Sequence, residues 1–308
     1  METYIPKKSL NPPTKGNGLI RTFAMVKPDA YTHIGKIVDI IYTNGFQITK
    51  LKMAKMTQQN AQEFYAEHIG KPFFPNLSAF ITSDVVVGME LVADSAVSKW
   101  RNLIGPTDTT KAKAEAPKSL RAMFGSDATK NAVHGSDSSA SAKRELDYFF
   151  SNKLGTTAVL NNCSCVAVKP HSVLAGHAGK IIDAILEEGF EISAMEMFYL
   201  DKPSSEEFFE VYKQVLPEFV PMVEHMTTGA IIAMEVRQEN VIKTLRQLVG
   251  PHDPEIAKNL RPNTLRAKYG MDRIKNAIHC TDLEEDGVLE CEYFFSLLQQ
   301  KKDEQAKL

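Results

Sequence analysis

The feature that most constrains the fold of this chain is an internal repeat, because the sequence matches itself at an offset of about 145 residues. Residues 24–28 (AMVKP) match residues 166–170 (VAVKP), and residues 131–134 (NAVH) match residues 276–279 (NAIH). Shorter matches join Gly45-Phe46 to Gly189-Phe190, Met89-Glu90 to Met234-Glu235, Gly105-Pro106 to Gly250-Pro251, and Tyr148-Phe149-Phe150 to Tyr293-Phe294-Phe295. A period of roughly 20–50 residues would indicate a solenoid, whereas this longer period indicates two copies of one whole domain.

Length and composition agree with two globular domains. The 308 residues correspond to two domains of about 150 residues each, and 43% hydrophobic with 24% charged residues excludes a disordered or fibrous chain. The 36 Lys and Arg nearly balance the 38 Asp and Glu, which disfavours a polybasic nucleic-acid binder. No run of about 18 apolar residues predicts a membrane span, and the N-terminus lacks the apolar core of a secretory signal. Four cysteines are too few for a disulfide framework, so we expect an intracellular protein in a reducing compartment.

The turn-forming and polar stretches predict where the domains begin and end. Prolines and glycines near the N-terminus indicate an irregular arm over residues 1–19, before a first domain over residues 20–151. A polar stretch over residues 152–162 is the expected linker to a second domain over residues 163–300. The polar residues 301–308 are expected to form a tail.

Hydrophobic periodicity predicts the same order of elements in both copies. In the first copy it predicts strands near residues 22–26, 46–53, 85–87 and 131–134, and helices near residues 35–43, 57–68, 72–82, 94–104 and 138–149. This order is typical of the ferredoxin-like βαββαβ pattern. We therefore predict an α+β protein with two tandem ferredoxin-like domains. Each domain is expected to be an antiparallel sheet with helices covering one face.

Polar residues that recur in both copies point to chemistry, because core packing already explains the apolar repeats. They are Lys27/Lys169, Arg101/Arg246, Arg121/Arg266, Asn131/Asn276, His134/His279 and Glu145/Glu290. A single histidine is more often a packed or surface residue, but here three cations accompany it in each copy. Arginine binds phosphate oxygens bidentately and lysine adds a point charge, so the set suggests a polyphosphate site. A neutral imidazole can accept a phosphoryl group, and a glutamate bonded to its other nitrogen would fix the tautomer.

The residues resemble the nucleoside diphosphate kinase family, whose hallmark is N-x-x-H-G-S-D. Residues 131–137 read NAVHGSD, and the resemblance covers about residues 20–150 and 163–296. Neither a G-x-x-x-x-G-K-[ST] loop nor the protein-kinase motif set occurs in the sequence, which excludes those two kinds of phosphate site. The tandem arrangement is similar to a two-domain branch of the family that is associated with cilia and γ-tubulin complexes. We expect its usual N-terminal DM10 module to be missing.

The resemblance implies a complete site in the first copy. His134 is the implied phosphorylated nucleophile, through its Nδ1 atom, with Glu145 and Ser136 orienting the ring and Tyr65 near the imidazole. The implied nucleotide contacts come from Lys27 (sugar and phosphate), Asn131 (ribose 3′-hydroxyl), Arg101, Thr107 and Arg121 (β- and γ-phosphates), and Phe73 (base, with Ala128 opposite). Mg²⁺ would accompany the nucleotide phosphates, so no protein metal site is predicted.

The second copy departs from the family pattern. Phe209 stands in place of Tyr65, His252 in place of Thr107, and Cys280 in place of Gly135, while Phe219 is the candidate base-stacking residue. The retained candidates are Lys169, Arg246, Arg266, Asn276, His279, Thr281 and Glu290. Because one lost charge-assisted contact costs about 1.5–3 kcal/mol, catalysis by this copy stays open, and a degenerate copy kept for packing is the alternative.

Two functions are consistent with these residues. The first is ping-pong transfer of the γ-phosphoryl group from a nucleoside triphosphate to a nucleoside diphosphate through His134. The second is a structural component of the doublet-microtubule inner wall or of a γ-tubulin complex, with residual or no kinase activity. The resemblance implies tubulin, doublet-microtubule inner proteins or the γ-tubulin complex as partners, and the cytoplasm, the cytoskeleton and the ciliary axoneme or basal body as locations. The long segment 108–120 and the second copy in cis together suggest an internal pseudo-dimer.

The cysteines give one weaker signal. Cys163-Ser164-Cys165 has the spacing of a metal-binding pair, but no second Cys/His pair lies nearby in the sequence. The sequence therefore favours a structural role at the start of a strand.

Overall fold

This computed structural model describes residues 19–305, with side chains for residues 20–301. Most of the expected N-terminal arm therefore lies outside the described residues. The strands of the first copy are β1 (Leu19–Val26), β2 (Gln47–Lys55), β3 (Val85–Asp94) and β4 (Val133–Gly135). Its helices are η1 (Pro28–His33), α1 (Ile34–Thr43), α2 (Gln58–Phe64), η2 (Ala66–His68), α3 (Phe74–Ile81), α4 (Ala96–Ile104), α5 (Thr109–Glu115), α6 (Leu120–Phe124) and α7 (Ser139–Phe149).

The second copy repeats this order. Its strands are β5 (Cys163–Val168), β6 (Glu191–Tyr199), β7 (Ala230–Arg237) and β8 (Ile278–Cys280). Its helices are α8 (Pro170–Leu174), α9 (Ala178–Glu187), α10 (Lys202–Phe208), η3 (Glu210–Tyr212), α11 (Phe219–Met226), α12 (Val241–Val249), α13 (Pro254–Leu260), α14 (Leu265–Tyr269) and α15 (Asp286–Glu292). A π-helical turn, η4 (Tyr293–Leu297), joins α15 to α16 (Leu298–Gln305), so helix extends into the expected tail.

All eight strands form one antiparallel sheet in the order β4-β1-β3-β2-β6-β7-β5-β8. Each half has the strand order of a ferredoxin-like domain, which confirms the predicted fold class. The halves join where β2 pairs with β6 through Lys52 and Glu196. The Tyr31 hydroxyl reinforces the junction, because it accepts a hydrogen bond from the Ile192 N–H (2.7 Å) and donates one to the Ile192 carbonyl (3.0 Å).

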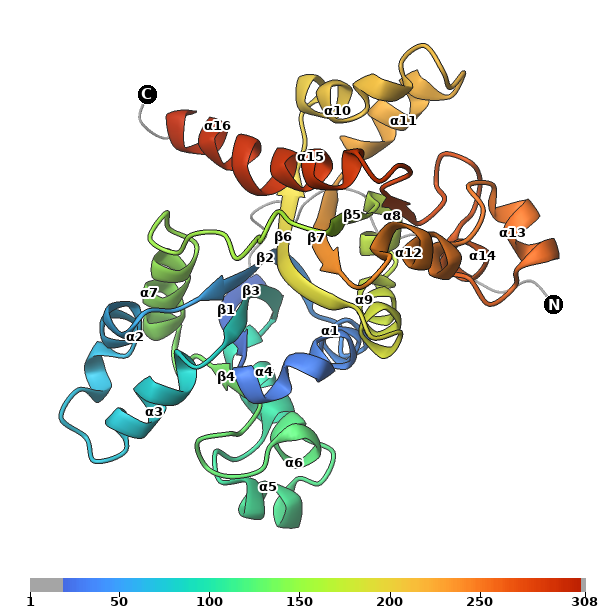
Figure 1. Ribbon diagram of the computed structural model, residues 1–308. Coiled ribbons are helices and arrows are strands. Elements are labelled where there is room, and N and C mark those ends of the chain that lie inside the picture. Colours follow the sequence, from blue (N-terminus) through green and yellow to red (C-terminus); the bar gives the residue numbers. More distant parts are fainter. Residues whose placement is uncertain (1–18, 306–308) are drawn as a thin grey trace.

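Helices cover both faces of the sheet, so the expectation of helices on one face was wrong (Figure 1). The alternation along β1 gives the reason: Ala24 and Val26 pack towards α1 and α4, whereas Phe23 and Met25 pack towards α2, α3 and α7. Both sets of side chains are apolar and buried, so neither face can be left to water. No helix among residues 19–305 combines the length and the apolar character needed to cross a membrane.

The core on the α1 face is continuous through both copies, because α1 and α9 lie side by side (Figure 1). Two glycines allow this close approach. A Cβ atom at Gly35 would lie 2.3 Å from the backbone nitrogen of Asp183, and one at Gly179 would lie 2.3 Å from that of Asp39. The contact is therefore reciprocal, as in a two-fold symmetric dimer, although both partners belong to one chain.

We expect Gly35→Ala to lower the free energy of unfolding by about 1–3 kcal/mol, because the new methyl group meets backbone atoms that cannot rotate away. This loss should exceed the gain of about 1 kcal/mol in helix propensity. Urea denaturation followed by circular dichroism measures the change. Gly179→Ala should behave alike, and Gly155→Ala, which meets no atom within 4 Å, is the matched control. A fully stable Gly35→Ala variant would contradict the close packing of α1 and α9.

Candidate active site

His134 lies in the short edge strand β4, two residues after a residue with a strained backbone. Ala132 has φ of 65°, a region that residues other than glycine rarely occupy. Its N–H donates to Asp29 Oδ2 at 2.9 Å, and its carbonyl accepts from the Lys27 N–H at 2.8 Å. Such strain persists only where the surroundings fix it, so these two bonds set the direction in which β4 presents His134.

The imidazole of His134 is held at its Nε2 atom. Nε2 lies 3.1 Å from Glu145 Oε2, and the Ser136 hydroxyl donates to the same oxygen at 2.6 Å. A carboxylate at Nε2 favours the tautomer with the proton on Nε2 and the lone pair on Nδ1. Phe23 and Phe64 pack against the ring with centroids 6.0 and 5.9 Å away. The arrangement leaves Nδ1 as the free nucleophilic atom of a fixed ring.

Lys27 is a buried cation that directly follows β1, the strand paired with β4. Its ammonium donates to Asn131 Oδ1 at 2.7 Å and to the Thr129 carbonyl at 3.3 Å. Burial, and secondarily the neighbouring Arg121, lower the pKa of Lys27 to about 8. An anion bound here would regain the electrostatic energy that burial costs the ammonium group.

Arg121 is a second buried cation. Its guanidinium donates to the carbonyls of Val133 (3.2 and 3.3 Å) and Gly105 (2.9 Å) and to the Thr107 hydroxyl (3.3 Å). Burial and then the nearby Arg101 lower the pKa of Arg121 to about 10. Arg101 itself is exposed on α4 and forms no ion pair within the described part of the chain. The structure thus brings Lys27, Arg121 and Arg101 together as one positively charged region.

Two aromatic side chains complete the predicted set. Tyr65 is buried with its ring 5.7 Å from that of His134, and its hydroxyl has no hydrogen-bond partner among the described residues. An unpartnered buried hydroxyl is a ready donor to an oxygen of a bound group. Phe73 is 49% exposed just before α3, and His68 links its ring to Tyr65 through centroid distances of 5.5 and 5.8 Å. An exposed ring in this position is free to stack on a planar ligand.

The second copy keeps the histidine geometry. His279 Nε2 lies 2.8 Å from Glu290 Oε2, and the Thr281 hydroxyl donates to the same oxygen at 2.8 Å. The His279 side chain is 7% exposed, against 18% for His134. Phe209 packs its ring 5.9 Å from His279, in the place of Tyr65 but without a hydroxyl. The His279 ring is therefore held in a fixed orientation, but it is less exposed than the His134 ring.

The exposed arginine of the second copy is neutralised. Arg246 forms an ion pair with Asp282 at 3.1 Å, and the Tyr212 hydroxyl donates to the other oxygen of Asp282 at 2.8 Å. The corresponding residues of the first copy, Arg101 and Asp137, form no such pair in the described structure. A phosphate group would have to displace the carboxylate of Asp282 before it could bind Arg246.

An ion pair also occupies the position of the base-binding residues. Glu218 precedes α11 as Phe73 precedes α3, and it lies 2.7 Å from Arg273, which stands where the first copy has Ala128. Phe219 is buried in the core, so its assignment as the base-stacking residue was wrong. A helix register that differs by one residue from the expected one explains the error.

Lys169 and Asn276 of the second copy lack the mutual hydrogen bond that their counterparts form in the first copy. Lys169 donates to the Ile274 carbonyl, and Oδ1 of Asn276 has no hydrogen-bond partner within the described structure. In the first copy Lys27 donates directly to Asn131. Burial and then Arg266 lower the pKa of Lys169 to about 7 and that of His252 to about 4. The second site therefore carries less positive charge near neutral pH.

Sequence reasoning missed Asp29, whose carboxylate accepts a hydrogen bond from the strained Ala132. Asp29 follows the Lys-Pro pair of the first copy directly, but His171 takes this place in the second copy and contacts His225 at 2.9 Å instead. The difference between the copies was visible in the repeat. The role of Asp29 was not, because its partner Ala132 lies far along the chain.

The family model and the similar proteins point to the same family. The family model described as nucleoside diphosphate kinase matches residues 20–154 and 162–299. Nucleoside diphosphate kinase homolog 7 of Rattus norvegicus is 46% identical over 282 residues, which cover 90% of this chain and 71% of the relative. The Mus musculus protein of the same name is 45% identical with the same coverage. Thioredoxin domain-containing protein 6 of Xenopus laevis is 33% identical, over 89% of this chain and 43% of its own length.

Two solved structures are similar to half of the chain. A nucleoside diphosphate kinase of Aquifex aeolicus is 45% identical with a TM-score of 0.43, covering 44% of this chain and 96% of its own. A nucleoside diphosphate kinase of Halobacterium salinarum in complex with CDP is 38% identical with a TM-score of 0.40, covering 44% of this chain and 90% of its own.

We expect the affinity of the first site for ADP to fall as the pH rises above about 8. The pKa of Lys27 is lowered, so the ammonium loses its proton near pH 8 and the anion then binds a neutral amine, with a loss of up to about tenfold per pH unit. Isothermal titration calorimetry measures this change. Lys27→Met is the matched variant and should bind weakly with little pH dependence in this range. Equal pH dependence in both proteins would contradict the role of Lys27.

Proposed function

Because the chain belongs to the nucleoside diphosphate kinase family, we propose that its first copy transfers a γ-phosphoryl group through His134 from a nucleoside triphosphate to a nucleoside diphosphate. The main support is the orientation of the ring, whose Nε2 atom is held by Glu145 at 3.1 Å. A nucleophile needs one free nitrogen in a fixed direction, and Nδ1 meets that need.

The proposed transfer takes two steps. In the first, the Nδ1 lone pair attacks the γ-phosphorus, a nitrogen–phosphorus bond forms, and the bond to the bridging oxygen breaks with its electron pair going to the diphosphate. Glu145 stabilises the imidazolium by accepting the Nε2–H hydrogen bond. In the second, a terminal oxygen of another diphosphate attacks the same phosphorus and restores neutral His134. Each step replaces one bond to phosphorus by another. The protein therefore contributes mainly by positioning the reactants and by stabilising the negative charge of the phosphates.

The charges around His134 fit a triphosphate that arrives with Mg²⁺. The nearby carboxylates already have partners, since Glu145 bonds His134 and Ser136, while Asp137 accepts from Ser141 at 2.6 Å. These residues offer no cage for a resident metal, so we propose that phosphates and water hold the ion. Mg²⁺ would neutralise part of the phosphate charge, and Lys27 and Arg121 would bind the remaining oxygens.

We propose that turnover is confined to the first copy. In the second copy, ion pairs occupy both the phosphate-binding arginine (Arg246 with Asp282) and the base position (Arg273 with Glu218). A nucleotide would have to break both pairs and would gain no hydroxyl from Phe209. These contacts favour a copy that stabilises the fold over one that catalyses.

We expect His134→Ala to abolish the acid-labile phosphoprotein formed with γ-labelled ATP and to lower nucleotide exchange by at least ~1,000-fold, because no other group replaces the nucleophile. His279→Ala is the matched variant in the second copy and should retain exchange within about twofold. Labelling followed by acid treatment, together with steady-state exchange kinetics, measures both effects. Persistent labelling of His134→Ala would disprove the assignment, and strong loss in His279→Ala alone would place catalysis in the second copy.

Specific observations also favour a second, structural function. Large apolar side chains are exposed mainly on the second copy, among them Leu260 (75%), Val215 (71%), Met271 (67%) and Leu289 (62%). Exposed apolar side chains are available for contacts with a partner protein where several of them lie together. We propose tubulin, doublet-microtubule inner proteins or the γ-tubulin complex as partners, and the cytoplasm and cytoskeleton, including the ciliary axoneme or basal body, as locations. These partners and locations come from the family resemblance, and the similarity to nucleoside diphosphate kinase homolog 7 agrees with that resemblance.

A structural function predicts that microtubule binding does not require catalysis. We expect His134→Ala to co-sediment with microtubules as the unmodified protein does, because the exposed residues lie in the other copy. A double Leu260→Ser, Met271→Ser variant should bind at least about tenfold more weakly, since two apolar contacts are lost. Loss of binding in His134→Ala, or undiminished binding in the double variant, would argue against a separate binding surface.

A further inference from the structure

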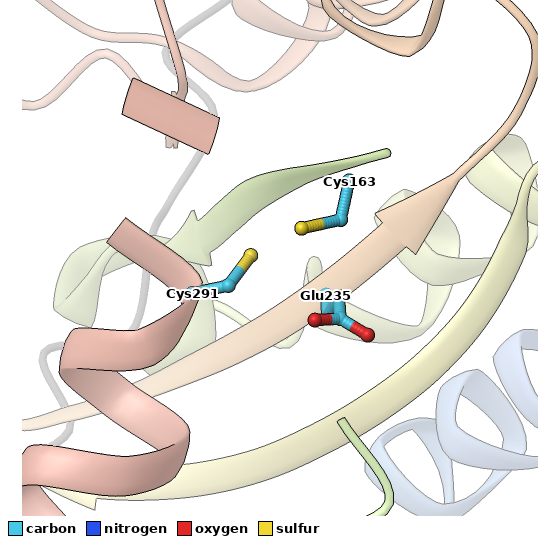
Figure 2. Close-up of side chains that lie close together, drawn as sticks. All are labelled: Cys163, Glu235 and Cys291. Atoms are coloured by element: carbon cyan, nitrogen blue, oxygen red, sulfur yellow. The ribbon is translucent and has the colours of Figure 1, made fainter. Parts of the chain in front are cut away.

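Three of the four cysteines of the chain gather at one place in the second copy. Cys163 opens β5, Cys165 lies two residues further on the same face, and Cys291 reaches them from α15. Figure 2 shows the Cys163 and Cys291 sulfur atoms beside the carboxylate of Glu235 on β7. The ligand atoms of Cys163, Cys291 and Glu235 all lie within 4.8 Å of one another, and all three residues are buried. Two soft sulfur ligands and one carboxylate thus converge on one small space.

The first copy shows what the fold requires at these positions. There the buried carboxylate of Glu90 pairs with Arg21 at 3.3 Å and with Lys50 at 3.9 Å. In the repeat, Cys163 replaces Arg21 and Cys291 replaces Leu146. The second copy therefore has the same buried carboxylate, but thiols stand near it in place of the cations. Packing alone does not explain this exchange, because a buried carboxylate is more stable beside a cation.

The carboxylate of Glu235 is held in place by neutral donors. Oε1 accepts from the Val159 N–H at 2.6 Å and from the Ser193 hydroxyl at 2.5 Å, and Oε2 accepts from the Leu160 N–H at 2.9 Å. The Cys163 thiol also hydrogen-bonds to this carboxylate. No ion pair to Glu235 forms among the described side chains. A metal ion would replace the thiol proton in the contact between Cys163 and Glu235, so the carboxylate could ligate the ion and keep its backbone hydrogen bonds.

A glycine brings the helix close enough for Cys291 to reach the strand. A Cβ atom at Gly287 would lie 2.2 Å from the Cys163 carbonyl oxygen, so only glycine permits this approach of α15 to β5. Cys291 follows Gly287 by one helical turn and lies on the same face. The first copy has Ala142 at the position of Gly287. The close approach is specific to the copy that carries the thiols.

We propose that Cys163, Cys291 and Glu235 bind a zinc ion. Zinc accepts thiolate and carboxylate ligands together, with zinc–sulfur bonds of about 2.3 Å that bring two sulfurs to within about 4 Å, so small rotations of the side chains complete the site. Binding releases the two thiol protons to solvent, and the net charge of the cluster stays at one negative charge. Cys165 hydrogen-bonds to Cys291 and is the nearest further thiol that the cluster contacts.

The site would fasten the linker between the copies. Val159 and Leu160 belong to the linker, and their N–H groups hold the same carboxylate that ligates the metal. The zinc would join this carboxylate to β5 and α15, and so tie the linker to the second copy. The role would be structural, since the cluster is distant in the fold from His134, at the other half of the sheet.

The first test uses the unmodified full chain under reducing conditions. Because the cluster is closed to solvent, zinc is added both to the folded protein and during refolding from urea. We expect one zinc per chain by elemental analysis after removal of free metal. Cd²⁺ as a substitute should give the ultraviolet sulfur-to-metal charge-transfer band of thiolate ligation. Absence of bound metal by both routes overturns the proposal.

Variants then locate the metal. Cys163→Ser and Cys291→Ser should each lower zinc affinity by at least about 100-fold and remove most of the Cd²⁺ band. Cys280→Ser is the matched control, because Cys280 lies in β8 outside the cluster, and it should bind one zinc with unchanged affinity. Zinc retained by both cluster variants overturns the proposal. So does a reduced protein that binds no zinc but forms a Cys163–Cys291 disulfide on oxidation.

Discussion

The close contact between α1 and α9 determines how the two halves of this protein combine. Gly35 and Gly179 let the backbones meet, and the apolar side chains of both helices then fill one core beneath the whole eight-stranded sheet. On the other face each copy has its own core, with α2, α3 and α7 in the first and α10, α11 and α15 in the second. The α1 face therefore joins the two copies, whereas each copy has a core of its own on the other face.

The copies differ on their separate faces and around the nucleotide site. The thiol cluster lies on the separate face of the second copy, and there Cys163, Cys165 and Cys291 replace Arg21, Phe23 and Leu146. The nucleotide site differs in its peripheral charges: Asp282 neutralises Arg246 in the second copy, while the corresponding Arg101 stays unpaired in the described structure. The bond between histidine and glutamate is kept in both copies, at 3.1 and 2.8 Å.

Much of the fold could be predicted from the sequence, because the repeat and the hydrophobic periodicity are local signals. The α+β fold of two antiparallel domains and the kinase family were both predicted and are confirmed. The helix layer on the second face was not, since a short apolar run such as β1 does not show which helices cover each of its sides. The assignment of Phe219 failed by one residue at a helix start, where Glu218 takes the position of Phe73. The partners of Cys163 could not be found, because Glu235 and Cys291 meet it only through long-range packing.

The linker has a consequence for how the assembly forms. In a dimer of separate subunits, association is bimolecular, so the dimer dissociates into single subunits on dilution. Here the short connection over residues 152–162, fastened at Glu235, keeps the second partner at an effective concentration in the millimolar range. The union of the two sheets is thus independent of how much protein a cell makes, and every chain carries one intact histidine site beside one divergent one.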